Sequence, residues 1–301
     1  MPVAPVAISL AYNSSPSGMD IQSYLFGKNI YLVSKHQKEN VIAPLFAKAF
    51  QANLQVLDFD TDTLGTFSGE IERPASQSET ALLKIEAFAK QYPFAKLIMS
   101  SEGAFFPHPE IPMLTVNTEL VVLKSFEQNW VVKGFNNTYE TNAASITVKD
   151  WSELETFANK IGFPEQGIIL MSDEPVIQER KIYKNNPDIH SLHVHFDTLI
   201  QNSNTVIAET DLRAMHNPTR MQQIGLATEN LIENLLSSCP NCNTPGFSKK
   251  DMMSGLPCCW CNTPTRLTGA YIYSCDNCQF KKEEKVKEPC ADPQYCDVCN
   301  P

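Results

Sequence analysis

The sequence predicts an α/β fold, a mixed sheet with flanking helices, followed by a small C-terminal zinc-ribbon-like module. Short apolar runs alternate with stretches of helical periodicity, as expected for strands separated by helices. All ten cysteines lie between Cys239 and Cys299. A chain of 301 residues, 43% of them hydrophobic, is long enough for about two domains. We therefore expect a loose N-terminal leader over residues 1–29, an α/β domain over 30–237 and a Cys-rich zinc-binding module over 238–301.

The predicted strands of the α/β domain are its short apolar runs, which are bounded by polar or turn-forming residues. They cover residues 30–34, 55–59, 97–99, 146–148, 168–171, 191–196 and 205–208. Residues 97–99 are expected to run into an acidic Ser-Gly turn at 100–103. Residues 119–124 and 130–135 flank a short polar turn, which predicts an antiparallel hairpin.

Local patterns mark the predicted helix starts. They are Pro44 at a first helical position, the capping-box spacing of Ser76 and Glu79, the same spacing at Asp150 and Glu153, and the pair Asn217 and Pro218. Residues 35–39 are expected to form a polar loop before the first of these helices. Apolar residues recur at helical spacing after each start, so each helix should bury one face.

Eight of the cysteines form CxxC pairs, which indicates metal rather than disulfides in a chain without an export signal. The pairs are Cys239/Cys242, Cys258/Cys261, Cys275/Cys278 and Cys296/Cys299. Because two CxxC knuckles close one tetrahedral site of four thiolates, the sequence predicts two structural zinc ions. A strand expected at residues 271–273 favours an inner site from the second and third pairs and an outer site from the first and last. Sequential and interleaved pairings are the alternatives.

The remaining residues of interest in the module have simpler expected roles. Cys259 and Cys290 fall outside the pattern and are expected to be bystanders rather than ligands. Trp260 and Phe280 are expected to cover the zinc knuckles, with a partner surface as the alternative. A closed site of four cysteines has no free coordination position, so its metal should hold the module together rather than take part in chemistry.

Residues 58–84 contain six acidic side chains among Thr, Ser and Gly, and they include a helix start. Carboxylates, hydroxyls and a helix N-terminus are groups that hold a divalent cation and phosphate oxygens. The alternative is an acidic surface loop with nothing bound.

A second candidate set consists of His193, His195 and Asp197, which alternate along a predicted strand and would share one face. Such a set can bind a transition metal. Alternating residues on a solvent-facing strand have the same pattern, and we favour that interpretation.

Charge and hydropathy restrict the partners. The formal net charge is −10, and the excess of acid lies before Cys239, since the rest of the chain has seven basic and seven acidic residues. The absence of a basic patch weighs against nucleic acid as the main partner. No apolar run reaches the ~18 residues of a membrane span, and the N-terminus lacks the basic residues of a signal peptide. We therefore expect a cytoplasmic protein with no membrane partner.

Two groups of segments resemble a mainly bacterial family that is known only as a domain of unknown function. The C-terminal segments are CPNCNTPGF, GLPCCWCNTPT, YSCDNC and ADPQYCDVCNP. The segments FDTDTLGTFSGEIER, SSEGAFFPHP and ETDLRAMHNPTR resemble the N-terminal part of the same family. The resemblance covers most of the chain from about Ile30 onward and implies no activity.

A second resemblance is to nucleoside triphosphate pyrophosphatases of the inosine triphosphatase and Maf type. Their polar loop with Lys and Glu after a first strand is similar to residues 34–39, and their E-N-A-x-x-K helix start is similar to residues 79–84. Their acidic-Ser-Gly turn resembles residues 101–103. Arg213 and residues 216–220 stand where their Ser-His-Arg element would be. Residues 58–73 have no clear counterpart in these enzymes.

This second resemblance implies a metal-dependent phosphohydrolase that acts on a nucleotide. Its catalytic and Mg²⁺-holding carboxylates would be Glu102, Glu39, Glu70 and Asp62. Its phosphate-binding cations would be Lys38, Lys84 and Arg220. The alternative is a non-enzymatic protein whose zinc module docks on a protein or RNA partner.

Overall fold

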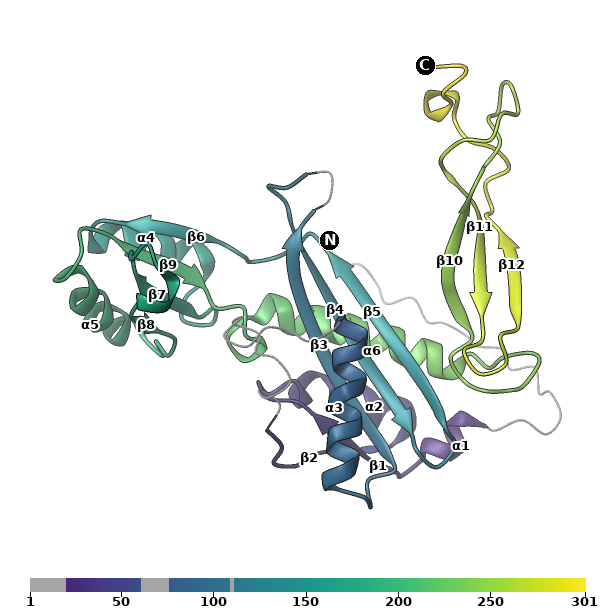
Figure 1. The fold of residues 1–301 in the computed structure, drawn as a ribbon, viewed down its shortest axis with the longest axis horizontal. Helices are drawn as coiled ribbons and strands as arrows, with labels where there is room; N and C mark the ends of the chain where they lie inside the picture. Colours follow the sequence, from purple (N-terminus) through teal and green to yellow (C-terminus); the bar gives the residue numbers. More distant parts are fainter. Residues whose placement is uncertain (1–19, 61–75, 109–110) are drawn as a thin grey trace, which may run out of the picture. The chain divides into compact units, whose positions relative to one another are not determined.

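A computed structural model of the chain describes residues 20–60, 76–108 and 111–301 (Figure 1). Its contacts divide the chain into two compact units, one of Leu25–Ser237 and one that contains Ser238–Pro301 and residues 20–24. The predicted mixed α/β fold with a C-terminal cysteine module is confirmed. No helix of the described residues is long and apolar enough to cross a membrane.

The elements follow one another as alternating strands and helices. The helices are α1 (Ile21–Leu25), α2 (Glu39–Phe50), α3 (Gln77–Gln91), α4 (Trp151–Ile161), α5 (Ile189–Ile200) and α6 (Pro218–Leu236). The larger sheet contains β1 (Asn29–Val33), β2 (Asn53–Val56), β3 (Leu97–Pro107), β4 (Thr115–Ser125) and β5 (Trp130–Thr138). The smaller sheet contains β6 (Ser145–Val148), β7 (Ile168–Ser172), β8 (Ile182–Tyr183) and β9 (Val206–Thr210). The cysteine module contains β10 (Ser248–Ser254), β11 (Thr268–Ser274) and β12 (Lys281–Lys285).

The larger sheet has the strand order β2-β1-β3-β4-β5 and is covered on both faces. β1 is parallel to β2 and β3, and the pairs β3–β4 and β4–β5 are antiparallel, as predicted for the hairpin. α3 covers one face, where Ile85 and Phe88 pack with Ile98 and Leu120. Each such fully buried side chain contributes roughly 1.5–3 kcal/mol. α2 and α6 lie on the other face, where a Cβ on Gly134 of β5 would be 2.3 Å from the α6 backbone.

The path of the chain creates a topological switch point between β1 and β3. From β1 the chain passes through α2 to the edge strand β2, and from β2 it returns across the opposite face through α3 to β3. Open α/β sheets bind ligands at such points, outside the carboxyl ends of the strands. Lys38 follows β1 at this point, and Ser101 and Glu102 lie on the neighbouring β3.

The smaller sheet is antiparallel, with the strand order β6-β9-β7-β8. Leu154 of α4 and Leu192 of α5 are fully buried with Ile168 and Val206 of its strands in one core. α4 begins as predicted, because the Asp150 carboxylate accepts a hydrogen bond from the Glu153 backbone N–H at 3.0 Å.

Residues 191–196 lie in helix α5, so the predicted strand is wrong. Asp188 caps this helix, and Leu192, Phe196 and Leu199 form its buried face at helical spacing. His193 and His195 are two residues apart on a helix and therefore face in different directions. They stack on different aromatic rings, and His193 pairs with Asp197 at 3.7 Å. The shared face expected for the three residues does not exist.

Other boundaries also differ from the prediction, and β2 covers Asn53–Val56 where the sequence predicts a strand at 55–59. α2 begins at Glu39, so Pro44 lies inside the helix and not at its first position. The helix starts early because His36 and Gln37 have positive φ angles of 75° and 57°, which turn the chain sharply after β1. β3 continues through residues 100–103, where the sequence predicts a turn, because these residues pair in register with β4.

Candidate functional site

Lys38 occupies the switch point, just after the carboxyl end of β1 and beside the middle of β3. Its Nζ donates to the Ser101 backbone oxygen at 2.7 Å and lies 3.2 Å from Ser101 Oγ. Lys38 is only 5% exposed, and among the described residues it forms no ion pair. A buried ammonium group with neutral hydrogen-bond partners is costly, because burial disfavours the charged form.

Lys84 and Glu102 form a buried ion pair between α3 and β3. Lys84 Nζ lies 2.6 Å from Glu102 Oε1. The predicted capping box is confirmed: the Ser76 hydroxyl accepts from the Glu79 backbone N–H, and the Glu79 carboxylate accepts from the Ser76 backbone N–H. This cap fixes the start of α3 and so places Lys84 in the second turn, facing the sheet.

Arg220 and Glu119 form a second buried ion pair on the α6 side of the sheet. Arg220 Nε donates to Glu119 Oε1 at 2.7 Å, and Nη1 donates to the Leu212 backbone oxygen at 2.7 Å. The Arg220 backbone N–H donates to the N-cap residue Asn217 at 2.9 Å, as the sequence predicts for this helix start. A Cβ on Gly103 would lie 2.1 Å from Arg220 Nη2 and 2.4 Å from Glu119 Oε1. Glycine is therefore needed at position 103 for the ion pair to approach the strand.

These side chains form a buried charge cluster around Lys38, which among the described residues holds three cationic groups and two anionic groups. The cluster consists of Lys38, Lys84, Arg220, Glu102 and Glu119, all of which are buried. Burial is the main reason that the pKa of Lys38 falls to about 8; Arg220 acts in the same direction, and Glu119 and Glu102 oppose it. Lys38 therefore titrates close to neutral pH, and an anion at the switch point would stabilise its charged form.

Four buried polar atoms on the cluster residue Glu119 and on neighbours of the cluster have no hydrogen-bond partner among the described residues. They are Ser100 Oγ, Asn117 Oδ1, Glu119 Oε2 and Asn217 Nδ2. Most buried polar atoms in native proteins are paired, so such atoms mark a place where water or a ligand binds. The region thus combines surplus positive charge with unused hydrogen-bonding capacity.

The structure brings together part of the site that the sequence suggests. Lys38, Lys84, Arg220 and Glu102 all belong to the cluster. Glu39 is partly exposed at the start of α2, directly after Lys38, and Glu70 and Asp62 lie outside the described residues. Sequence reasoning missed Glu119, which looks like an ordinary strand residue. Gly103 was the available indication, because a glycine inside a strand marks a close approach of another group.

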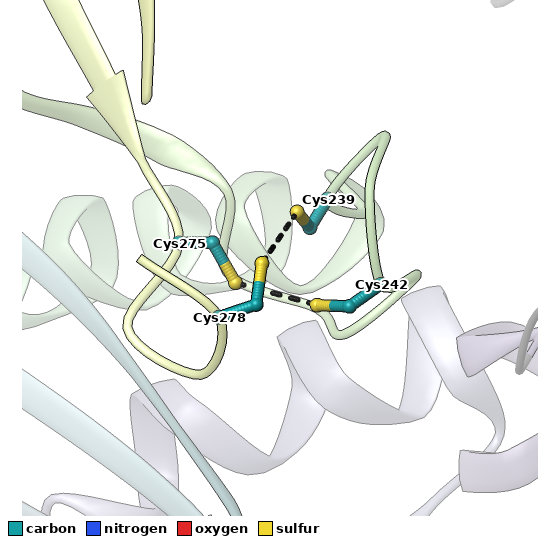
Figure 2. Close-up of side chains that lie close together, drawn as sticks. All are labelled: Cys239, Cys242, Cys275 and Cys278. Atoms are coloured by element: carbon teal, nitrogen blue, oxygen red, sulfur yellow. Dashed lines mark hydrogen bonds between the residues drawn. The ribbon is translucent and has the colours of Figure 1, made fainter. Parts of the chain in front are cut away.

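Cys239, Cys242, Cys275 and Cys278 gather their sulfurs into one group, the first cysteine centre (Figure 2). Cys239 Sγ is 3.7 Å from Cys278 Sγ, and Cys242 Sγ is 3.6 Å from Cys275 Sγ. Four thiolates at ~2.3 Å around a tetrahedral zinc ion lie ~3.8 Å apart. The four sulfurs therefore fit a tetrahedral metal ion.

Cys258, Cys261, Cys296 and Cys299 form the second cysteine centre in the same way. Cys258 Sγ is 3.9 Å from Cys299 Sγ, and Cys261 Sγ is 3.6 Å from Cys296 Sγ. Hydrogen bonding with the Thr263 side chain and backbone lowers the pKa of Cys261 to about 6, whereas hydrogen bonding with Cys261 raises the pKa of Cys299 to about 12. The thiolate is the form that binds metal, so the shift at Cys261 favours ligation.

The CxxC pairs combine in an interleaved order, first with third and second with fourth. The favoured inner site from the second and third pairs is wrong, and one of the alternatives holds. The reason is strand register. Ser248 of β10 pairs with Ser274 of β11, which also pairs with Lys281 of β12, so the knuckle before β10 meets the knuckle between β11 and β12. The second knuckle follows β10 at the other end of the sheet.

Cys259 and Cys290 belong to neither cysteine centre, as expected, but they form a disulfide with each other, which the sequence did not predict. Backbone pairing brings them together: Cys258 bridges to Ala291, and the Cys259 N–H donates to the Ala291 backbone oxygen at 3.0 Å. Their separation of 31 residues in the sequence gave no indication of this contact. The module therefore contains one disulfide besides its two cysteine centres.

The two aromatic residues near the knuckles differ from each other. Phe280 covers the first cysteine centre as expected, packing with Phe247 at 5.9 Å between ring centroids. Trp260 is 77% exposed and covers nothing. Its ring projects from the second CxxC knuckle, so the expectation that it covers a zinc site is wrong.

Comparison with known proteins places the chain in a family without a known activity. A family model described as "Domain of unknown function (DUF6671)" matches residues 88–301, which include both cysteine centres. No curated protein matches the chain. The crystal structure of protein VC0702 from Vibrio cholerae is similar at 12% identity, over 70% of this chain and 96% of that chain, with a TM-score of 0.31. A likeness at this level supports no conclusion about fold or function.

Proposed function

The chain belongs to the family described as "Domain of unknown function (DUF6671)", and we propose that it is a metal-dependent phosphohydrolase acting on a nucleotide. Its C-terminal module would be stabilised by two zinc ions. The resemblance of residues 34–39, 79–84 and 101–103 to nucleoside triphosphate pyrophosphatases supports this proposal, because residues from all three segments lie in or beside the buried charge cluster.

The observation that carries the proposal is the surplus positive charge of the cluster at the switch point. Lys84 reaches β3 from the α3 face and Arg220 reaches it from the α6 face, and Lys38 lies beside β3 within the electrostatic reach of both. Glu102 and Glu119 balance two of these charges. A phosphate group would supply the missing negative charge, and its oxygens form strong charge-assisted hydrogen bonds with buried cations.

The carboxylates would act once phosphate is bound. Glu102 is paired with Lys84 at 2.6 Å, so a phosphate oxygen that binds Lys84 would free Glu102 for another role. Glu102, with Glu39 at the start of α2, would then hold Mg²⁺ on the phosphate side of the cluster. A bound Mg²⁺ supplies charge neutralisation for phosphate oxygens and a more acidic water. Arg220, fixed by Glu119 and the Leu212 carbonyl, would orient the phosphate chain.

The experiment is a pyrophosphate-release assay with the purified full chain. The protein is incubated with Mg²⁺ and a panel of common and deaminated nucleoside triphosphates. We expect release with at least one substrate, and a kcat at least ~100-fold lower for Glu102→Gln. Glu86→Gln is the matched control, since Glu86 of α3 also pairs with a lysine, Lys124, and neither residue belongs to the cluster. If the unmodified chain is no more active than Glu102→Gln on any of the substrates, the enzyme proposal is refuted.

Zinc in the two cysteine centres is proposed from the all-thiolate ligand sets and their tetrahedral spacing. Metal analysis of the purified chain should find two zinc ions per chain. Cys275→Ser should lower the count to about one, because it removes a ligand from the first centre only. A count well under two for the unmodified chain would contradict the zinc assignment.

A second candidate function is docking on a protein or RNA partner through the zinc module. It is favoured by the exposure of Trp260, with Tyr295 and Val298 also exposed on the neighbouring C-terminal knuckle. Aromatic residues of this kind are common at the centres of binding interfaces. This function replaces the first if two results are found together. The unmodified chain shows no hydrolase activity, and it binds a protein or RNA partner that the Trp260→Ala variant does not bind.

A further inference from the structure

The two cysteine centres are held in different surroundings. Aromatic side chains pack around the first centre, namely Phe247, Tyr273 and Phe280. The side-chain N–H groups of Asn241 and Asn277 lie 3.5 and 3.7 Å from its sulfurs. At the second centre the large side chains on the knuckles, Trp260, Tyr295 and Val298, point to solvent. The second centre therefore depends more on how its two ligand-bearing segments are tied together.

A short bridge ties these segments. The Ala291 N–H donates to the Pro257 backbone oxygen at 2.7 Å, and the Cys259 N–H donates to the Ala291 backbone oxygen at 3.0 Å. The Cys259–Cys290 disulfide stands beside these bonds and joins the two segments covalently. Cys259 is the direct neighbour of the ligand Cys258, so the disulfide is built into the knuckle itself.

On the basis of the zinc loading proposed above, we propose that the second cysteine centre is an exchangeable metal site locked by the Cys259–Cys290 disulfide. The first centre would hold its metal whether the disulfide is oxidised or reduced. The two centres thus have different tasks: one maintains the fold of the module, and the other releases metal in response to a reducing environment.

The redox step is an ordinary thiol–disulfide exchange. Cys259 is exposed and Cys290 is half-buried, so a dithiol reductant can reach the bond. One thiolate of the reductant attacks a sulfur of the disulfide and forms a mixed disulfide, and its second thiolate displaces the remaining protein sulfur. Two electrons and two protons pass to the protein, which leaves Cys259 and Cys290 as thiols and the reductant as a disulfide.

Cleavage weakens the second centre through the chain and leaves its ligands unchanged. The disulfide closes a loop over a sequence separation of 31 residues and keeps the pair Cys296/Cys299 close to the pair Cys258/Cys261. A tether of this kind raises the effective concentration of one ligand pair at the other. Without it, the two pairs separate more often, and the zinc they share dissociates faster. Losing a loop closure of this size should raise the dissociation rate of the zinc in the second centre at least about tenfold.

The experiment measures zinc transfer from the loaded, oxidised full chain to a chromogenic chelator, with and without a water-soluble tertiary phosphine. The phosphine reduces the disulfide with one water and becomes a phosphine oxide, so no competing thiol is added. In the oxidised protein both zinc ions should transfer slowly. After reduction, one of the two should transfer at least about tenfold faster. The double variant Cys259→Ser/Cys290→Ser should behave as the reduced protein under both conditions.

Cys296→Ser provides the second arm, because it removes the second centre and spares the disulfide. Its remaining zinc should transfer slowly with or without phosphine. Equal rates for both zinc ions before and after reduction, or equal acceleration of both, would overturn the proposed lock. The proposed lock would also be overturned if the phosphine still accelerated zinc transfer from Cys296→Ser. A count well under two zinc ions in the oxidised chain would instead contradict the zinc loading, so the two failures are distinguishable.

Discussion

Gly103→Ala is expected to displace the buried ion pair between Arg220 and Glu119. The added Cβ would lie 2.1 Å from Arg220 Nη2, and 2.4 and 2.6 Å from the two oxygens of Glu119. Real Cβ contacts are essentially never shorter than 3.0 Å, so something must move. The strand cannot yield easily, because Gly103 pairs with Glu119 in the middle of the long β3–β4 ladder. The side chains of the ion pair must therefore shift away from the added Cβ.

The expected loss follows from the burial of both partners. Glu119 is fully buried and Arg220 is nearly so. Breaking a buried ion pair costs about 3–5 kcal/mol, and overpacking alone costs about 1–3 kcal/mol. We expect the free energy of unfolding to fall by about 3–5 kcal/mol if the pair separates, and by about 1–3 kcal/mol if the two side chains shift together and keep the 2.7 Å Nε–Oε1 hydrogen bond.

The assay is urea unfolding of the full chain followed by far-UV circular dichroism. Gly225→Ala is the matched control, because Gly225 lies in α6 and its nearest neighbour to an added Cβ is Val41 Cγ2 at 3.1 Å. That substitution should change the free energy by less than about 1 kcal/mol, since better helix propensity offsets the tight contact. Gly103→Ala within about 0.5 kcal/mol of the unmodified chain would refute the reasoning.

The remaining predictions concern the helix starts and Lys38. Ser76→Ala should lower the free energy of unfolding by about 1 kcal/mol in urea titrations, because it removes the capping hydroxyl of α3; no change would contradict the capping role. Pro44→Ala should raise the free energy of unfolding by roughly 1–3 kcal/mol, because alanine restores a backbone N–H inside α2. A lower free energy of unfolding would contradict this prediction and show that Pro44 packs favourably. The pKa of Lys38 is lowered from 10.5 to about 8, so between these values the unfolded chain binds more protons than the folded chain. The unfolding free energy should therefore rise with pH over that window, by about 3 kcal/mol in total, and Lys38→Met should flatten the rise; an equal slope in both proteins would exclude a buried, shifted Lys38.

The parts of the fold that sequence reasoning predicts well are those set by neighbouring residues. The α3 start depends on Ser76 and Glu79, which are three residues apart, and it is confirmed. α5 was missed because the alternation of His193 and His195 resembles a strand, although the Asp188 cap and the spacing of its buried leucines are local too. The apolar residues Leu192, Phe196 and Leu199 recur at helical spacing and predict the helix α5.

The candidate site depends on contacts between distant residues, and only part of it was predictable. Lys84 and Glu102 were proposed for one site, but their direct pairing follows from the position of α3 over β3. Glu119 lies 101 residues from Arg220 in the sequence and becomes its partner only through the strand order of the sheet. The combination of cysteine pairs depends in the same way on the register of β10, β11 and β12.

The interleaved cysteine pairs also determine how the module can assemble. The ligands of the first centre end at Cys278, so this centre can fill with metal without Cys296 and Cys299. The pair Cys258/Cys261 lies within the loop that the first centre closes. A filled first centre therefore confines that pair and lowers the entropy cost of closing the second loop. Metal uptake by the module should accordingly be sequential and cooperative, with the first centre acting as the nucleus.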